Sequence, residues 1–277
     1  MAQDYRPGDD SVQLNSIEIS FLNYLVENAN YKEVLFGTSK LLNTPDLLTA
    51  DQMDSVCFLR GWSFYQLQKS DSAVGYLRKV RRNSPLGEKS KYYAVFNSIY
   101  IREFDSADSL LIDKSPGFEN LDLLDKGGIY LLKKNLAAFD SIAGSFDFND
   151  YTMAAEQHNL IQLADTLRKY PKKSGVLAGV MSAVVPGSGK VYTGKTAQGI
   201  AVFLETAALG LAATEYYVKK GPQSAGFIVF GSLFTFFYIG NIWGSALSVH
   251  VNRTEFYERI DNNIMVDLHV PLRRIFD

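Results

Sequence analysis

The stretch AGFIVFGSLFTFFYIGNIWGSALSV, residues 225–249, contains no Asp, Glu, Lys, Arg or His. A helix of about 20 apolar residues is long enough to cross the hydrocarbon core of a bilayer. A second such stretch, 197–218, precedes it and has Glu205 as its only deep ionisable residue. A short polar turn, 219–224, separates the two. We therefore expect a transmembrane helical hairpin; the alternative is a buried hairpin of a soluble protein.

The distribution of charge divides the chain into two parts. The 28 basic and 30 acidic residues give a formal net charge of −2, without the strong basic excess typical of nucleic-acid-binding proteins. Residues 1–170 mix charged and apolar residues throughout, whereas charges nearly vanish between residues 174 and 251. We expect two domains, residues 1–170 and residues 171–277, and no nucleic-acid partner.

The content of cysteine and histidine limits the chemistry. Cys57 is the single cysteine, so an internal disulfide and a multi-cysteine metal site are both excluded. It falls in an apolar helical stretch, which favours a buried structural thiol over a nucleophile. The three histidines are scattered along the chain. We predict no catalytic, metal or cofactor site, and we do not expect an enzyme.

Residues 54–87 have small and apolar residues at the spacing of a 34-residue helix–turn–helix unit. Small residues suit a close crossing of the two helices, larger ones fill the space between them, and a proline ends the second helix because it cannot donate the helical hydrogen bond. The positions are Gly61, Phe64, Ala73, Leu77 and Pro85. This pattern resembles the tetratricopeptide repeat family.

Weaker copies of the same unit occur at residues 30–34, 103–107 and 134–138. The resemblance implies an all-α domain of stacked helix pairs, whose concave face commonly binds a peptide or a protein. A generic helical domain is the alternative. Four aromatic residues at helical spacing are candidates for a partner-binding groove, although such a stripe is more often repeat core; they are Tyr92, Tyr93, Phe96 and Tyr100.

Residues 174–185 are apolar but too short to span a bilayer, so we expect an interfacial or re-entrant helix there. The turn after it contains Pro186, Gly187, Gly189, Tyr192 and Gly194. This PGxGxxYxG pattern resembles the opening of small bacterial membrane domains of unknown function. The resemblance implies a membrane location and no particular activity.

Small and polar residues in the two expected spans predict how the helices pack. Gly240 and Gly244 have the spacing of close helix contacts in membranes. In an antiparallel hairpin, Glu205 would lie level with Asn241, and the amide would satisfy a carboxyl that is costly in lipid. A small proton- or ion-coupled module centred on Glu205 is a functional alternative.

Residues Gly189 to Thr196 match the GxxxxGK[ST] pattern of a phosphate-binding loop. A phosphate-binding loop follows a buried strand and opens an amphipathic helix. Here we expect a helical domain before residues 189–196 and an apolar helix after them. A P-loop ATPase is therefore an alternative that the context does not favour.

Two features bear on location. Ala2-Gln3 at the start resembles the region around a signal-cleavage site, which together with the family resemblance favours a periplasmic repeat domain on a bacterial inner membrane. The lysines and arginines before the first span instead favour the cytoplasm. We expect residues 252–277 to form an amphipathic tail. The function expected is a membrane-anchored scaffold or adaptor that binds a partner protein, within an envelope assembly or secretion complex.

Overall fold

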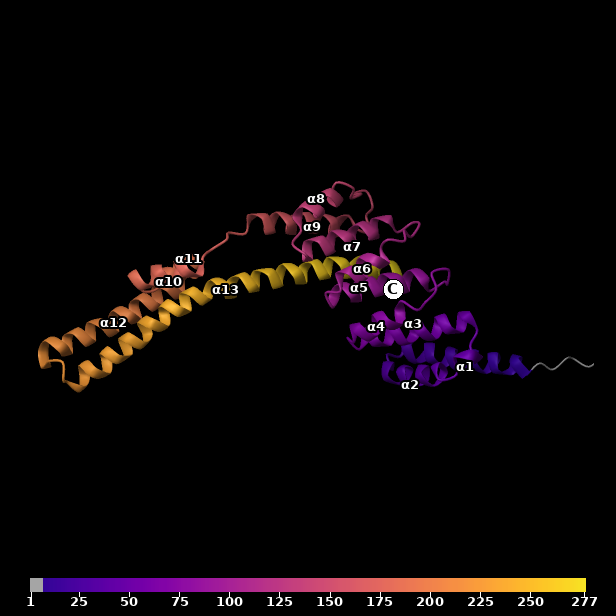
Figure 1. The fold of residues 1–277 in the computed structure, drawn as a ribbon, viewed down its shortest axis with the longest axis horizontal. Coiled ribbons are helices and arrows are strands. Elements are labelled where there is room, and N and C mark those ends of the chain that lie inside the picture. Colours follow the sequence, from indigo (N-terminus) through magenta and orange to yellow (C-terminus); the bar gives the residue numbers. More distant parts are fainter. Residues whose placement is uncertain (1–6) are drawn as a thin grey trace, which may run out of the picture. The chain divides into compact units, whose positions relative to one another are not determined.

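The computed structural model describes residues 7–277, with side chains from Gln13 onward, and every regular element in that range is a helix (Figure 1). The expected all-α class is thus confirmed for the described residues, and Ala2-Gln3 lies outside them. The helices of the first 170 residues are α1 (Pro7–Glu27), α2 (Tyr31–Leu42), the 3-10 helix η1 (Pro45–Leu47), α3 (Ala50–Gln66), α4 (Ser70–Leu77), α5 (Gly87–Tyr100), α6 (Phe104–Leu110), α7 (Glu119–Leu132), α8 (Leu136–Ala143) and α9 (Ala154–Lys169). They are followed by α10 (Gly175–Val184), α11 (Ser188–Thr193), α12 (Thr196–Lys220) and α13 (Ala225–Phe276).

Contacts divide the chain into two compact units. The array unit contains the residues up to Thr166 together with Asn263–Asp277, which we call the C-terminal segment. The hairpin unit contains Leu167–Asn262. Residues 263–277, which were expected to belong to the second domain, group with the array unit.

Four successive helix pairs in the array unit have the same turn between their helices. The pairs are α1/α2, α3/α4, α5/α6 and α7/α8. In each turn one residue is left-handed and the next amide donates to the carbonyl five residues back, as in a Schellman motif. The left-handed residues are Ala29, Gln68, Arg102 and Lys134, and the bonds are Asn30 N to Leu25 O, Lys69 N to Phe64 O, Glu103 N to Ser98 O and Asn135 N to Tyr130 O. A single local geometry therefore recurs four times.

The second pair illustrates why small residues are needed at the crossing. A Cβ atom on Gly61 of α3 would meet Leu77 Cγ of α4 at 2.7 Å, closer than real contacts allow. Ala73 and Leu77 are buried in the same crossing. The start of α3 is fixed by a capping box, in which Thr49 and Gln52 satisfy each other's backbone amides.

In the hairpin unit, α12 and the first half of α13 run side by side and are joined by a short turn (Figure 1). Both helices are long and apolar enough to cross a membrane. Their antiparallel packing is aromatic near the turn: Tyr216 stacks on Phe230 and Tyr217 contacts Phe227. Gly226 lies against Tyr216, where any side chain would collide with the ring.

The expected second span, 225–249, is only the first half of α13, because the helix continues unbroken to Phe276. No new helix begins at residue 252, so the expected tail is an extension of the span. Ser224 Oγ accepts a hydrogen bond from Phe227 N at the start of α13, and Gly221 has a φ of 80° at the end of α12. These residues make the reversal between the two long helices.

Candidate functional site

The four aromatic residues proposed for partner binding do not share one environment. Tyr92 and Tyr93 are fully buried and Phe96 is nearly so, whereas Tyr100 is 58% exposed. All four lie on α5. Only Tyr100 is open to a partner in the described structure.

The C-terminal segment covers the other three. The His269 ring stacks on Phe96 with ring centroids 4.6 Å apart, and the Phe276 ring stacks on Tyr92 at 5.8 Å. The Tyr93 hydroxyl donates to Asp277 Oδ2 at 3.0 Å. The aromatic face of α5 thus holds an amphipathic helix, and that helix belongs to the same chain.

Tyr65 of α3 and Lys89 of α5 extend this contact and were not identified from the sequence. The Tyr65 hydroxyl lies 2.5 Å from His269 Nε2. Lys89 Nζ donates to Phe276 O at 2.8 Å and to Asp277 Oδ1 at 3.0 Å. Burial, with a smaller effect from Asp277, raises the pKa of Tyr65 to about 12, so its hydroxyl stays protonated.

The opposite side of the segment packs on α7 and α9. Leu268 is buried with its methyl groups against Gly128, where an added Cβ would meet them at 2.7 Å. Asn159 Nδ2 donates to Asp267 Oδ1 at 2.9 Å, and Arg274 pairs with Glu156 at 3.0 Å. Apolar residues at three- to four-residue spacing near the end of the chain were the signal for such a buried helix.

The glycine motif of the hairpin unit forms a tight corner between α10 and α12. Gly187 and Gly194 cap the short helix α11 at its two ends, with φ of 84° and 95°. A Cβ on Gly187 would lie 2.1 Å from Gly199 O, and one on Gly189 would lie 2.0 Å from Ala178 O. Only glycine allows the backbones to approach this closely, which gives a physical reason for the motif.

Tyr192 and Pro186 complete the corner. The Tyr192 hydroxyl accepts a hydrogen bond from Ser174 N at 3.2 Å, just before α10 begins. Lys173 Nζ lies 5.7 Å from the centroid of the Tyr192 ring. Pro186 is in the turn that precedes Gly187. Tyr192 of α11 therefore contacts the residue at which α10 begins.

The amides that a phosphate-binding loop would offer to a nucleotide are already bonded within the protein. Gly189 N donates to Ser182 Oγ, and Lys190 N and Val191 N donate to Gly187 O. Gly194 N and Lys195 N likewise donate to backbone carbonyls of α11. No strand precedes this segment in the described residues. The arrangement is a helical corner and does not favour the ATPase alternative.

A polar seam, which we define as Asn241, Ser245 and Ser248 of α13 with Ser182 and Thr193, lies inside the hairpin unit. Ser182 Oγ and Ser245 Oγ are 2.7 Å apart, and Ser248 Oγ donates to Thr193 Oγ1 at 3.3 Å. Asn241 is 6% exposed, and its Nδ2 has no hydrogen-bond partner among the described residues. Polar contacts of this kind hold helices together in an apolar surrounding.

The seam differs from the packing expected from the sequence. Gly240 and Gly244 face open space, with no atom within 4 Å of an added Cβ. Glu205 is exposed and forms no hydrogen bond with Asn241, whereas its neighbour Thr206 is buried. In each helix the buried residue is the one directly after the residue expected to pack: Asn241 follows Gly240, and Thr206 follows Glu205. One residue corresponds to a rotation of about 100° around the helix axis.

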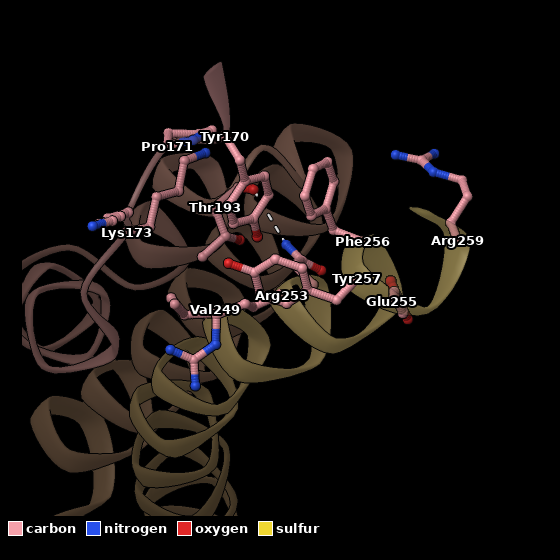
Figure 2. Close-up of a pocket in the computed structure, with 12 residues that line it drawn as sticks. Tyr170, Pro171, Lys173, Thr193, Val249, Arg253, Glu255, Phe256, Tyr257 and Arg259 are labelled. Atoms are coloured by element: carbon pink, nitrogen blue, oxygen red, sulfur yellow. Dashed lines mark hydrogen bonds between the residues drawn. The ribbon is translucent and has the colours of Figure 1, made fainter. Parts of the chain in front are cut away.

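The hairpin unit contains a pocket of about 430 Å³, and Val249 is one of the residues that line it (Figure 2). The rings of Tyr170 and Phe256 stack in its wall with centroids 3.9 Å apart. Asn252 Nδ2 donates to Thr193 O at 3.3 Å across its base, the bond drawn in Figure 2. Sequence reasoning missed this pocket because its residues come from three separate parts of the chain, 170–173, 193 and 249–259.

No group of three or more His, Cys, Asp or Glu side chains that could hold a metal ion occurs in the part of the chain that the structure describes. Comparisons with protein-family models, with curated proteins and with solved structures found no match to this chain.

Proposed function

We propose that this chain is a membrane-anchored adaptor, in which a helical-repeat domain binds a partner protein and a transmembrane hairpin holds it at a membrane. It acts by binding rather than by catalysis. The observation that carries the proposal is the aromatic face of α3 and α5, where Tyr65, Tyr93 and Phe96 hold an amphipathic helix. A surface that binds a helix of its own chain has the side chains needed to bind a similar helix of another protein.

The four recurring turns support the assignment of the array unit to tetratricopeptide-like repeats. Each pair of helices has one apolar face that only a neighbouring pair can cover, which is the principle of a repeat array. The crossing of Gly61 with Leu77 has the close approach that the family pattern requires. Such arrays commonly bind peptides or proteins.

The exposed surface of the hairpin unit supports the membrane anchor. Large apolar side chains such as Leu211, Phe236 and Trp243 are exposed on α12 and α13. Water would make this exposure costly, whereas lipid covers it without a penalty. The proposed location is a bacterial inner membrane, with the array in the periplasm and the cytoplasm as the alternative side.

A photo-crosslinking experiment on the full chain tests the adaptor function. Tyr100 is replaced by p-benzoylphenylalanine, and the protein is irradiated in native membranes and analysed by mass spectrometry. The matched control carries the same replacement at Tyr151, which is 89% exposed in the same unit but outside α5. We expect a discrete protein adduct from position 100 and none from position 151. Identical adducts from both positions, or none from either, would sink the proposal.

A further inference from the structure

Basic side chains predominate among the charged residues that line the pocket of Figure 2. Lys172, Lys173, Arg253 and Arg259 line it, against the single carboxylate of Glu255. Figure 2 shows Lys173 and Arg259 on opposite sides of the stacked Tyr170 and Phe256 rings. A concave surface that concentrates one sign of charge attracts a ligand of the other sign.

A second feature of this pocket is that its basic side chains lack ion-pair partners in the part of the chain that the structure describes. No ion pair holds any of the four basic side chains among the described residues, although Arg259 lies one helical turn after Glu255. Lys173 Nζ lies 5.7 Å from the centroid of the Tyr192 ring, an aromatic contact that leaves its charge unpaired. In contrast, Lys219 at the other end of α12 is paired with Glu215 at 2.6 Å. Unpaired cations around a recess are the usual composition of an anion site.

The pocket also lies at the depth of lipid headgroups if residues 225–249 span the membrane. Arg253 follows Val249 by one turn, or roughly 6 Å along the helix. The Cα of Arg259 lies about 15 Å beyond Val249, outside the headgroup layer, and only its long side chain, which tilts toward the N-terminus of the helix, reaches back toward that layer. Headgroup layers extend about 5–8 Å beyond the hydrocarbon on each side.

The shape and the polar base of the pocket suit a phosphate ester. A volume of about 430 Å³ exceeds what an inorganic phosphate needs and falls within the range of small-ligand sites. Asn252 Nδ2 donates one of its two N–H groups to Thr193 O, so the other can donate to a phosphate oxygen. The stacked rings of Tyr170 and Phe256 can contact an apolar part of the ligand. Guanidinium groups such as those of Arg253 and Arg259 match the geometry of phosphate oxygens.

We propose that this pocket binds a phosphate group, supplied either by the headgroup of an anionic lipid or by a small soluble phosphate. The site is independent of partner binding by the array unit. It would fix the end of the membrane hairpin at the headgroup level and hold the segment before α10 against α13 within the hairpin unit.

The test uses the full chain, purified in mild detergent and stripped of lipid. One arm titrates phosphatidylglycerol, with phosphatidylcholine as the uncharged comparison, and counts bound lipids by native mass spectrometry. The other arm titrates inorganic phosphate and measures heat of binding. Each arm uses the parent protein, the double variant Arg253→Gln/Arg259→Gln, and the control Lys219→Gln/Lys220→Gln, which removes two basic residues at the opposite boundary.

We expect the pocket variant to bind at least about tenfold more weakly in one arm, while the control changes by less than about twofold. Loss confined to the lipid arm identifies a headgroup, and loss in the phosphate arm identifies a soluble ligand. Equal weakening in both double variants means a diffuse surface charge effect and overturns the proposal. Binding that neither variant changes in either arm overturns it as well.

Discussion

At the scale of single residues, His269 is the most informative contact, because it joins the C-terminal segment to both α3 and α5. Its ring stacks on Phe96, and its Nε2 lies 2.5 Å from the Tyr65 hydroxyl. Burial lowers the pKa of His269 below its usual 6.5; Arg273 lowers it further, and Asp277 opposes the change. The neutral ring is therefore favoured in the docked segment.

This pKa shift predicts that the segment is held less tightly in acid. A released His269 regains its usual pKa of 6.5, so as pH falls through that value the released state takes up a proton before the docked state does. The stabilising contribution is complete above about pH 6.5 and declines below it. Hydrogen exchange of residues 263–277, corrected for intrinsic rates, should be faster at pH 5.5 than at pH 7.5. In His269→Gln this pH dependence should disappear; an unchanged pH response in the variant would refute the prediction.

The glycine motif has a local physical signal that the aromatic stripe of α5 lacks. Gly187 and Gly194 have left-handed backbones, which is the conformation that favours glycine, so their local requirement is visible in the sequence. Tyr92 and Tyr93 are aromatic and at helical spacing, but nothing in their neighbours distinguishes a groove from a core. Both tyrosines contact a segment more than 170 residues away in the chain, which the sequence around them does not indicate.

At the scale of elements, the C-terminal segment depends on its apolar side. Ile264, Leu268 and Leu272 are buried in the array unit, while Val266 and Val270 on the same helix are exposed. The repeat of buried positions every four residues is that of an amphipathic helix. Docking of the segment should therefore respond to truncation on one face and not on the other.

Leu268→Ala should lower the local stability of the docked segment by roughly 2–5 kcal/mol, since it removes a buried side chain and leaves a cavity against Gly128. Hydrogen exchange of the segment measures this free energy. Val270→Ala, at an exposed position of the same helix, is the control and should change it by less than about 0.5 kcal/mol. Equal effects of the two substitutions would show that the segment is not held by its buried face.

In the hairpin unit, the first long helix was predicted closely in extent, whereas only the start of the second was predicted. Spans were expected at 197–218 and 225–249, and the structure has helices Thr196–Lys220 and Ala225–Phe276. The starts of both helices could be predicted because an uncharged run and a polar turn are local features. The end of α13 was not, because polar residues after Val249 continue a helix as readily as they end one.

At the scale of the whole molecule, the hairpin makes a prediction about sidedness. If α12 and the first half of α13 both span the bilayer, the residues before and after the hairpin lie on one side and the turn lies on the other. In a Cys57→Ala background, Lys172→Cys and Asn262→Cys should react with an impermeant thiol reagent from the same side of sealed vesicles. Gln223→Cys should react only from the opposite side. Reaction of all three from one side would exclude a spanning hairpin.

What the sequence determined by itself was the set of local properties: an all-helical chain, two stretches long and apolar enough to cross a membrane, and glycines at a tight corner. The tertiary structure alone decided which faces of those helices meet. Glu205 is exposed while Thr206 is buried, and Gly240 is open while Asn241 is buried. A helix that is apolar on all sides carries no periodic signal of its facing side, and each residue turns that side by about 100°. The docking of residues 263–277 on α5 was hidden for a related reason, since it joins residues far apart in the chain through contacts that neither segment specifies alone.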